Sequence, residues 1–156
     1  MRAEFFDGEK LIGRSVLRAA DPPMGVAAGS FEPTEAYSRD VHANIIEGDY
    51  VGDRGLSLRS RSPDRGDIEG SIVIEDYTDS LGERQVSVIA IPYPEYGEYF
   101  ADDPGHRSYW GLDLSDEERR LRDEAIRASL RARNVRAWLW LGGILLAFVL
   151  LALWIF

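Results

Sequence analysis

The chain has 156 residues, a formal net charge of −9 and no cysteine. This length leaves room for one globular domain of ordinary size ahead of a C-terminal helical region. The lack of cysteine excludes a disulfide framework, a thiolate zinc site and a cysteine nucleophile. Over residues 1–113, acidic side chains outnumber basic ones by 22 to 11, which argues against nucleic acid as a partner because such a surface repels phosphate backbones.

The first predicted element is a β-hairpin that turns at an Asp-Gly pair, residues 7–8, because Asp-Gly supplies the positive φ values that a tight turn needs. Two registers fit this hairpin. A short loop would pair Phe6 with a glutamate, whereas a four-residue loop pairs Phe6 with Leu11 and Phe5 with Ile12. We favour the second register because it matches apolar side chains across the ladder.

Residues 21–30 are expected to form a loop, because two prolines remove backbone donors and two glycines loosen the backbone. The Gly-Lys-Ser/Thr ending of a P-loop is missing here, so a structural connection is favoured over a phosphate cradle. Residues 33–42 predict a short helix, with Tyr37, Val41 and Ile45 at four-residue spacing along one face.

Strands are predicted for the middle of the chain. Residues 56–61 alternate between apolar and polar side chains, turn chemistry follows at residues 62–66, and a second strand covers residues 70–77. Residues 85–91 are apolar on both faces and predict a central strand covered on both sides. The predicted fold class is mainly β: a small antiparallel β-rich domain, either a sandwich or an open barrel, with a long C-terminal helix that continues into one transmembrane span.

Aromatic residues gather after the last predicted strand. Tyr and Trp offer a large, rigid contact area with a polar tip and are enriched at binding hot spots, so this cluster is the best candidate for a partner-binding surface. The alternative is that the rings cover the open end of the sheet. The candidate residues are Tyr93, Tyr96, Tyr99, Phe100, Tyr109 and Trp110.

A long helix is predicted to begin at Ser115, whose side chain can accept from the amide three residues on while Glu118 reaches back. Neither proline nor glycine interrupts the sequence from residue 116 to residue 140. This helix carries a weak heptad-like stripe, which consists of Leu121, Ala125, Ala128, Ala132 and Val135. The stripe fits packing on the chain's own domain as well as pairing with a second chain.

Residues 138–156 carry no charge and include twelve Leu, Ile, Val or Phe side chains. As a helix this run is about 28 Å long, close to the ~30 Å core of a bilayer, and so predicts a transmembrane span. The arginines ahead of it predict that the N-terminal domain stays in the cytoplasm. The chain is therefore expected to be a single-pass, tail-anchored membrane protein that contacts the lipid bilayer. The predicted membrane-interface residues are Arg131, Arg133, Arg136, Trp138, Trp140 and Trp154.

Three parts of the chain follow from these patterns: an acidic cytoplasmic β-rich domain at 1–113, an Arg-rich juxtamembrane helix at 114–137, and the transmembrane tail anchor at 138–156. Within the predicted span, Gly143 and Ala147 form one small-x-x-x-small pair that would permit a homodimer.

No catalytic or metal site is predicted. The two histidines, His42 and His106, stand in no metal-ligand spacing, and no cofactor is expected. His106 near Asp102 is the least implausible acid–base pair. The leading hypothesis is a membrane-tethered β domain that serves as a protein-interaction module. The alternatives are an accessory subunit that docks through its span, and a small membrane-associated enzyme with an unassigned carboxylate and histidine site.

Overall fold

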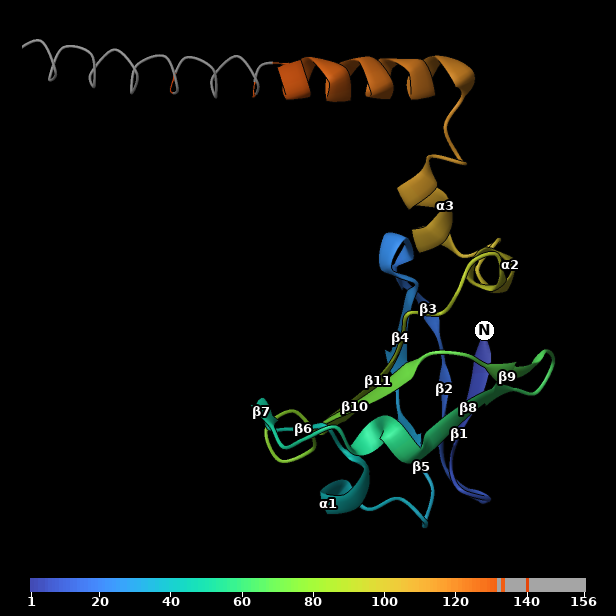
Figure 1. The fold of residues 1–156 in the computed structure, drawn as a ribbon, viewed down its shortest axis with the longest axis vertical. Coiled ribbons are helices and arrows are strands. Elements are labelled where there is room, and N and C mark those ends of the chain that lie inside the picture. The colour runs from blue at the N-terminus through green and yellow to red at the C-terminus, as the bar shows by residue number, and fades with distance from the viewer. Residues whose placement is uncertain (132, 134–139, 141–156) are drawn as a thin grey trace, which may run out of the picture. The chain divides into compact units, whose positions relative to one another are not determined.

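The computed structural model describes residues 1–131, 133 and 140, without the side chains of residues 55 and 56. The chain divides into two compact units, Met1–Leu112 and Asp113–Phe156. The first unit is mainly β and holds two sheets, and the second contains the C-terminal helix (Figure 1). The division of the C-terminal part into residues 114–137 and 138–156 stays a prediction.

The first sheet has five strands in the order β5-β2-β1-β8-β9, with all neighbours antiparallel. The strands are β1 (Arg2–Asp7), β2 (Lys10–Val16), β5 (Glu32–Pro33), β8 (Leu58–Ser62) and β9 (Gly66–Ile68). In β8, Leu58, Ser60 and Ser62 are buried while the residues between them are exposed. This strand therefore has one solvent-exposed face, as the alternating sequence predicted.

The β1–β2 hairpin confirms half of the preferred register. Phe6 pairs with Leu11 as predicted, but Phe5 pairs with Gly13 and not with Ile12, because the register shifts between Phe5 and Phe6. A bulge of this kind adds one residue to one strand. Its effect is that Phe5 and Ile12 both point into the core, where neither is exposed to solvent.

The second sheet has six strands in the order β3-β4-β11-β10-β6-β7. They are β3 (Arg18–Asp21), β4 (Val26–Ser30), β6 (Ile45–Ile46), β7 (Asp49–Tyr50), β10 (Ser71–Tyr77) and β11 (Glu83–Ile89). β6 and β10 run parallel, and the other neighbours are antiparallel. β11 lies between β4 and β10, which confirms its predicted internal position.

Both sheets contribute to one hydrophobic core. Phe5 and Ile12 enter it from the first sheet, and Ile74, Val86 and Val88 enter it from the second. All five side chains are fully buried. Each buried side chain of this size contributes about 1.5–3 kcal/mol to the free energy of unfolding, so this shared core holds the two sheets together.

The loop prediction for residues 21–30 is wrong in its second half. A short 3₁₀ turn, η1 (Pro22–Met24), leads into strand β4. Gly29 of β4 is needed because β2 approaches closely: a Cβ at this position would lie only 2.5 Å from the carbonyl oxygen of Val16. Sequence propensity disfavours Gly in strands, but here close packing requires it.

The helix predicted for residues 33–42 is also mostly wrong. Only α1 (Arg39–His42) is helical. Pro33 belongs to β5, and Thr34 is held in place because its hydroxyl donates to the Leu11 carbonyl at 2.6 Å. Between β7 and β8 lies a second 3₁₀ turn, η2 (Arg54–Ser57).

Two helices, α2 (Glu95–Tyr99) and α3 (Pro104–Trp110), follow the sheets. The start of α3 has a proline at its first position and an Asp103 carboxylate that accepts from the Gly105 N–H at 2.8 Å. Gly111, with φ 66°, ends this helix. Residues 102–105 therefore contain a helix start.

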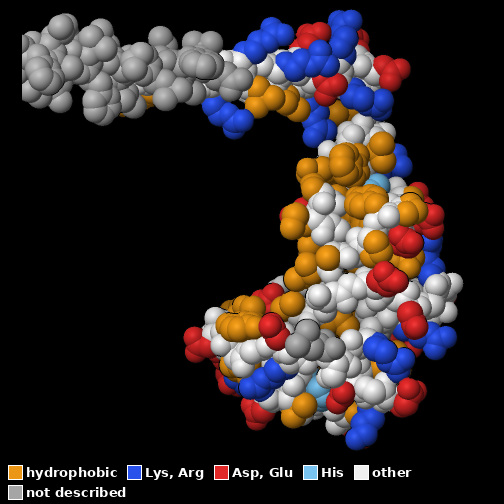
Figure 2. Space-filling model, viewed as in Figure 1, with side chains coloured by type: hydrophobic (Ala, Val, Ile, Leu, Met, Phe, Trp, Pro, Cys, Tyr) orange, Lys and Arg blue, Asp and Glu red, His pale blue; other side chains and the backbone are white. Residues whose placement is uncertain are grey.

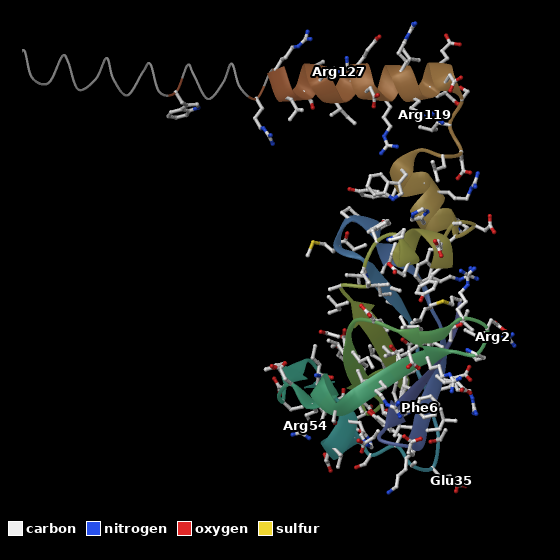
Figure 3. All side chains as sticks on the ribbon, turned by 45° about the vertical axis from the view of Figure 1, so that its right-hand side comes forward. Arg2, Phe6, Glu35, Arg54, Arg119 and Arg127 are labelled. Atoms are coloured by element: carbon white, nitrogen blue, oxygen red, sulfur yellow. The ribbon has the colours of Figure 1, made fainter. Side chains whose placement is uncertain are left out.

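In the second unit, residues 116–131 are helical. The predicted capping box is present: Glu118 N–H donates to Ser115 Oγ at 3.3 Å, and Ser115 N–H donates to Glu118 Oε2 at 2.9 Å. In Figure 2 this helix shows many blue and red side chains and a group of orange ones along its lower side, and Arg119 and Arg127 are labelled on it in Figure 3.

The prediction of a membrane-spanning helix is corrected. In the described part of the chain, no helix has the length and apolar character needed to cross a membrane. Residues 116–131 carry ten charged side chains, which an inserted helix does not tolerate. This finding contradicts the membrane, single-pass and tail-anchor predictions and the predicted membrane localisation. The predicted contact with the lipid bilayer is not tested and stays a prediction.

Most of the predicted span lies outside the described residues. This holds for Arg136, Trp138 and Trp154 at the predicted membrane interface and for the Gly143 and Ala147 pair. Arg131, Arg133 and Trp140 are described, and each is an exposed helical residue.

Candidate functional site

The aromatic cluster predicted as a partner site divides into buried and exposed rings. Tyr96 and Phe100 are buried in the core, with ring centroids 4.8 Å apart. The Tyr96 hydroxyl donates to the Val26 carbonyl at 2.8 Å. These two rings therefore fasten α2 to the second sheet.

The other rings reach the surface. Tyr93, Tyr109 and Trp110 are each close to half exposed, at 49%, 47% and 48%. The Tyr93 hydroxyl donates to the Pro22 carbonyl at 3.0 Å, and the Tyr109 and Trp110 rings meet edge to face with centroids 5.0 Å apart. Tyr99 is half-buried, and the Arg65 guanidinium lies 5.5 Å from its ring centroid.

Two further apolar residues, which the sequence did not single out, are exposed at the same end of the unit. Met24 in η1 is 64% exposed, and Leu112, just after α3, is 47% exposed. α3 packs beside η1 and β3, and apolar side chains gather over these elements in Figure 2. We call this set the α3-end surface, which consists of Met24, Tyr93, Tyr109, Trp110 and Leu112.

The unit that carries the α3-end surface is acidic. Residues 1–112 hold 21 acidic and 11 basic side chains, and the charges of Asp103 and Asp21 act on nearby Tyr96. Burial, together with these charges, raises the pKa of Tyr96. Its hydroxyl therefore stays protonated and keeps its hydrogen bond to β4 at physiological pH.

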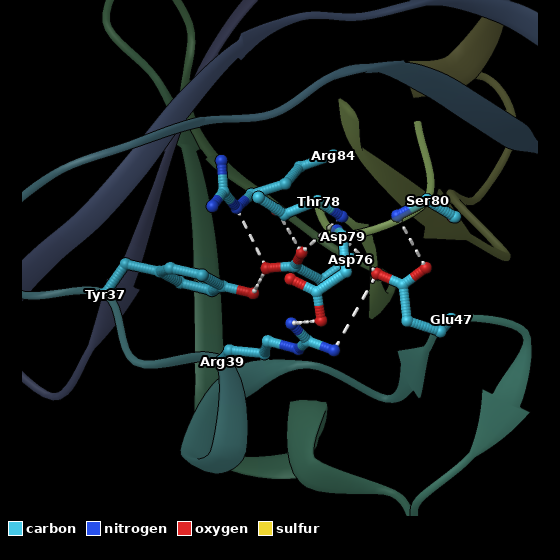
Figure 4. A network of polar contacts seen from close by, with 8 residues as sticks. All are labelled: Tyr37, Arg39, Glu47, Asp76, Thr78, Asp79, Ser80 and Arg84. Atoms are coloured by element: carbon cyan, nitrogen blue, oxygen red, sulfur yellow. Dashed lines mark hydrogen bonds and ion pairs between the residues drawn. The ribbon is translucent and has the colours of Figure 1, made fainter. Parts of the chain in front are cut away.

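A polar cluster centred on Asp76 joins β10 to α1 and to the β10–β11 turn (Figure 4). The Asp76 side chain is fully buried. It accepts from the Tyr37 hydroxyl at 3.0 Å, from Arg84 Nε at 2.8 Å and from the Thr78 N–H at 3.0 Å, and the Thr78 hydroxyl also donates to it. These four donors occupy the acceptor positions of the carboxylate.

The hydrogen bonds to Asp76 shift the pKa values of Asp76 and Tyr37 in opposite directions. Burial by itself raises the pKa of Asp76, but the hydrogen bonds from Thr78, Tyr37 and Arg84 outweigh it and lower the pKa. Burial and the bond to Asp76 raise the pKa of Tyr37. These shifts favour the ionised form of Asp76 and the protonated form of Tyr37, so the hydrogen bond between them is kept at neutral pH.

A second layer of the cluster ties two turns together. The Glu47 carboxylate accepts from the backbone N–H groups of Asp79 and Ser80, at 2.9 and 3.1 Å, and its pKa is lowered, first by a side-chain hydrogen bond with Ser80. Arg39 Nη1 lies 2.7 Å from Asp79 Oδ2, and Arg39 Nη2 lies 3.7 Å from Glu47 Oε1. The cluster as a whole fastens the β6–β7 turn to the β10–β11 turn.

Both histidines are buried. His42 Nδ1 accepts from the Ser38 N–H at 2.8 Å, and its Nε2 lies 3.5 Å from Asp7 Oδ2. His106 packs against the Tyr96 ring. In the described part of the chain, no ion pair joins His106 to Asp102. Nor does this part contain a group of three or more His, Cys, Asp or Glu side chains able to hold a metal ion.

Comparison of the chain with protein-family models, with curated proteins and with solved structures finds no match.

Proposed function

We propose that this protein is an interaction module that binds another protein through the α3-end surface. The observation that carries the proposal is the exposure of Tyr93, Tyr109 and Trp110 beside Met24 and Leu112 on one end of a small domain. Clustered, exposed aromatic side chains are uncommon on a surface without a partner and are enriched at binding hot spots.

The chemistry around the surface indicates the kind of partner. The unit has a net charge of −10 over residues 1–112, so a partner face with an apolar centre and a rim of Lys and Arg is complementary to it. Tyr109 and Trp110 each supply a flat ring with a polar tip at a low entropic cost of ordering. A protein surface therefore fits better than an anionic ligand.

The scaffold supports this reading. We infer a two-sheet sandwich and not a closed barrel, because each sheet ends in strands with one neighbour: β5 and β9 in the first sheet, and β3 and β7 in the second. A sandwich presents loops and short helices at its ends, and loops on a rigid scaffold commonly carry binding residues. η1 connects β3 to β4, and α2 and α3 follow the last strand, β11.

The test is co-purification with a matched surface control. The full chain with Tyr109→Ala and Trp110→Ala is compared with the full chain carrying Tyr50→Ala, which removes an exposed ring from β7. We expect one protein to co-purify with the wild type and with the control but not with the double variant. Equilibrium binding of that purified protein should weaken at least ~100-fold in the double variant, equivalent to about 2.7 kcal/mol.

Two results would overturn the proposal. One is binding that survives in the double variant, and the other is a double variant that loses binding only because its thermal midpoint has fallen. Circular dichroism of both variants separates these cases, since exposed side chains contribute little to stability. The enzyme alternative remains a prediction, and so does the homodimer. Sedimentation of the wild type over a concentration series tests the homodimer.

A further inference from the structure

The helix of the second unit, residues 116–131, has only exposed side chains. Its large apolar side chains Leu121, Ile126 and Leu130 are 54%, 46% and 43% exposed, and Figure 2 shows a group of orange side chains along one side of the helix. A helix in a protein gains most of its stability by packing an apolar face, and isolated helices shorter than ~12–15 residues are marginal in water. A partner that covers one face would therefore stabilise this helix.

One face of the helix carries a large apolar side chain beside charges of both signs. Leu121, Ala125 and Ala128 lie within about 60° of one another around the helix axis, because 3.6 residues make one turn. Their spacing of four and then three residues is that of the a and d positions of a coiled coil. Glu124 and Arg131, seven residues apart, lie along one flank of this face. We call these five residues the Leu121 face.

The charges of the helix are divided along its axis. Residues 116–124 hold five acids and three arginines, whereas residues 125–131 hold two arginines and no acid. A second copy of the helix in parallel would bring the two basic halves together. In antiparallel orientation it places each basic half beside an acidic half. The helix is therefore complementary in charge to an antiparallel copy of itself.

One antiparallel register suits the apolar and the charged positions of the Leu121 face together. When Ala125 lies level with Ala128 of a second copy, two-fold symmetry places Ala128 level with Ala125 of that copy. The same flank of both helices then meets, and Glu124 lies within about 3 Å, along the axis, of the level of Arg131 in the second copy. The symmetry repeats this contact, so the register contains two ion pairs.

The ion pair that Glu124 makes within its own helix leaves it able to form this contact. Glu124 Oε1 lies 3.6 Å from Arg120 Nε, and the two side chains are 60% and 73% exposed. An exposed ion pair of this kind contributes little to stability. The carboxylate also has further acceptor positions for a second guanidinium.

We propose that two copies of this protein pair through the Leu121 face, with their helices antiparallel and Glu124 of each copy against Arg131 of the other. The apolar positions of the face supply the contact area, and the two ion pairs select the orientation. The α3-end surface belongs to the first unit and takes no part in this contact. The pairing therefore stands without the function proposed above.

Sedimentation equilibrium of the full chain and its charge variants tests the proposal. We expect the wild type to dimerise over a concentration series. Glu124→Arg and Arg131→Glu should each raise the dissociation constant at least ~10-fold, because each change turns two attractions into two repulsions. The double variant Glu124→Arg with Arg131→Glu restores both attractions with the signs exchanged. Its dissociation constant should return to within about three-fold of the wild type.

Arg127→Glu is the matched control, because it changes the net charge as Arg131→Glu does but lies outside the Leu121 face. Its dissociation constant should stay within about three-fold of the wild type. Circular dichroism should show the same folded first unit in every variant. Three results would overturn the proposal: a wild type that stays monomeric, a double variant that fails to recover, and equal effects of Arg127→Glu and Arg131→Glu. Pairing through Gly143 and Ala147 would give the second kind of failure, since none of the charge changes would then affect the dimer.

Discussion

Two serines of β8 differ in one hydrogen bond, although both are buried. The Ser60 hydroxyl donates to the Ile68 carbonyl at 3.1 Å, whereas the Ser62 hydroxyl has no partner in the described part of the chain. An unsatisfied buried hydroxyl costs about 1–3 kcal/mol. Ser62→Ala should therefore raise the free energy of unfolding by about 1 kcal/mol, and Ser60→Ala should lower it by about 1 kcal/mol. Urea unfolding of both variants measures this, and an equal loss in both would contradict it.

Asp76 is the residue whose charge we expect to contribute most to the stability of the fold. Asp76→Asn should lower the free energy of unfolding by about 3 kcal/mol, because Arg84 loses its buried partner. Tyr37→Phe removes one of four donors to the carboxylate and should cost only about 1 kcal/mol. Urea unfolding midpoints at neutral pH should therefore fall further for Asp76→Asn than for Tyr37→Phe. The reverse order would show that the carboxylate is not the centre of the cluster.

The pH dependence of the Asp76 contribution follows from the direction of its pKa shift. Its pKa in the folded chain lies below the ordinary value of 3.8, so its contribution to stability is fully present above that value and is lost as the pH falls through the folded pKa. The stability gap between the wild type and Asp76→Asn should therefore be constant from pH 7 to about pH 5 and shrink below pH 4. A gap that widens on acidification would contradict the assignment.

At the scale of elements, the close approach of the two sheets determines which residue type a strand position tolerates, and local strand propensity does not. A Cβ at Gly29 in β4 would lie 2.5 Å from both Ser15 Oγ and the Val16 carbonyl oxygen. Gly29→Ala should therefore lower the free energy of unfolding by about 1–3 kcal/mol. Gly97→Ala in α2 is the control, because its Cβ would meet only the Tyr93 ring at 3.6 Å. Helix propensity should make that variant up to ~1 kcal/mol more stable.

The same elements show what could be predicted from the sequence. β11, the β1–β2 turn and the Ser115 capping box have strong local signals, and all three are present. β4 could not be predicted, because Ala and Gly have a low strand propensity and the need for Gly29 comes from the close approach of β2 in the other sheet. The short helix α3 went unpredicted although Asp103 and Pro104 form a normal helix start, because seven residues give no periodicity.

The candidate site was predictable only in part for a similar reason. The sequence located the aromatic cluster, but whether a ring is buried depends on partners distant in sequence. Tyr96 bonds to Val26, 70 residues away, while Trp110 remains half exposed. The Asp76 cluster likewise needs Tyr37, 39 residues away. Which side chains meet over such separations depends on the order of the strands in the sheets, and a single sequence does not reveal that order.

At the scale of the whole molecule, the core and the C-terminal helix belong to different units. Among the described residues, the fifteen that form the hydrophobic core all lie between Ala3 and Phe100, and the first unit ends at Leu112. We therefore expect a chain of residues 1–112 to fold alone with the thermal midpoint of the full chain, within about 3 °C.

The ¹H–¹⁵N spectrum and the urea midpoint of that shorter chain give the measurement. Amides of β1, β2, β10 and β11 should keep their full-chain shifts, because the packing around them is complete within residues 1–112. Ending the chain at residue 92 serves as the contrast. It removes Tyr96 and Phe100 from the core, and the loss of two large aromatic side chains, each worth about 3–5 kcal/mol, exceeds the usual margin of a small domain. If residues 1–112 were unfolded while the full chain was folded, the core would not be self-sufficient.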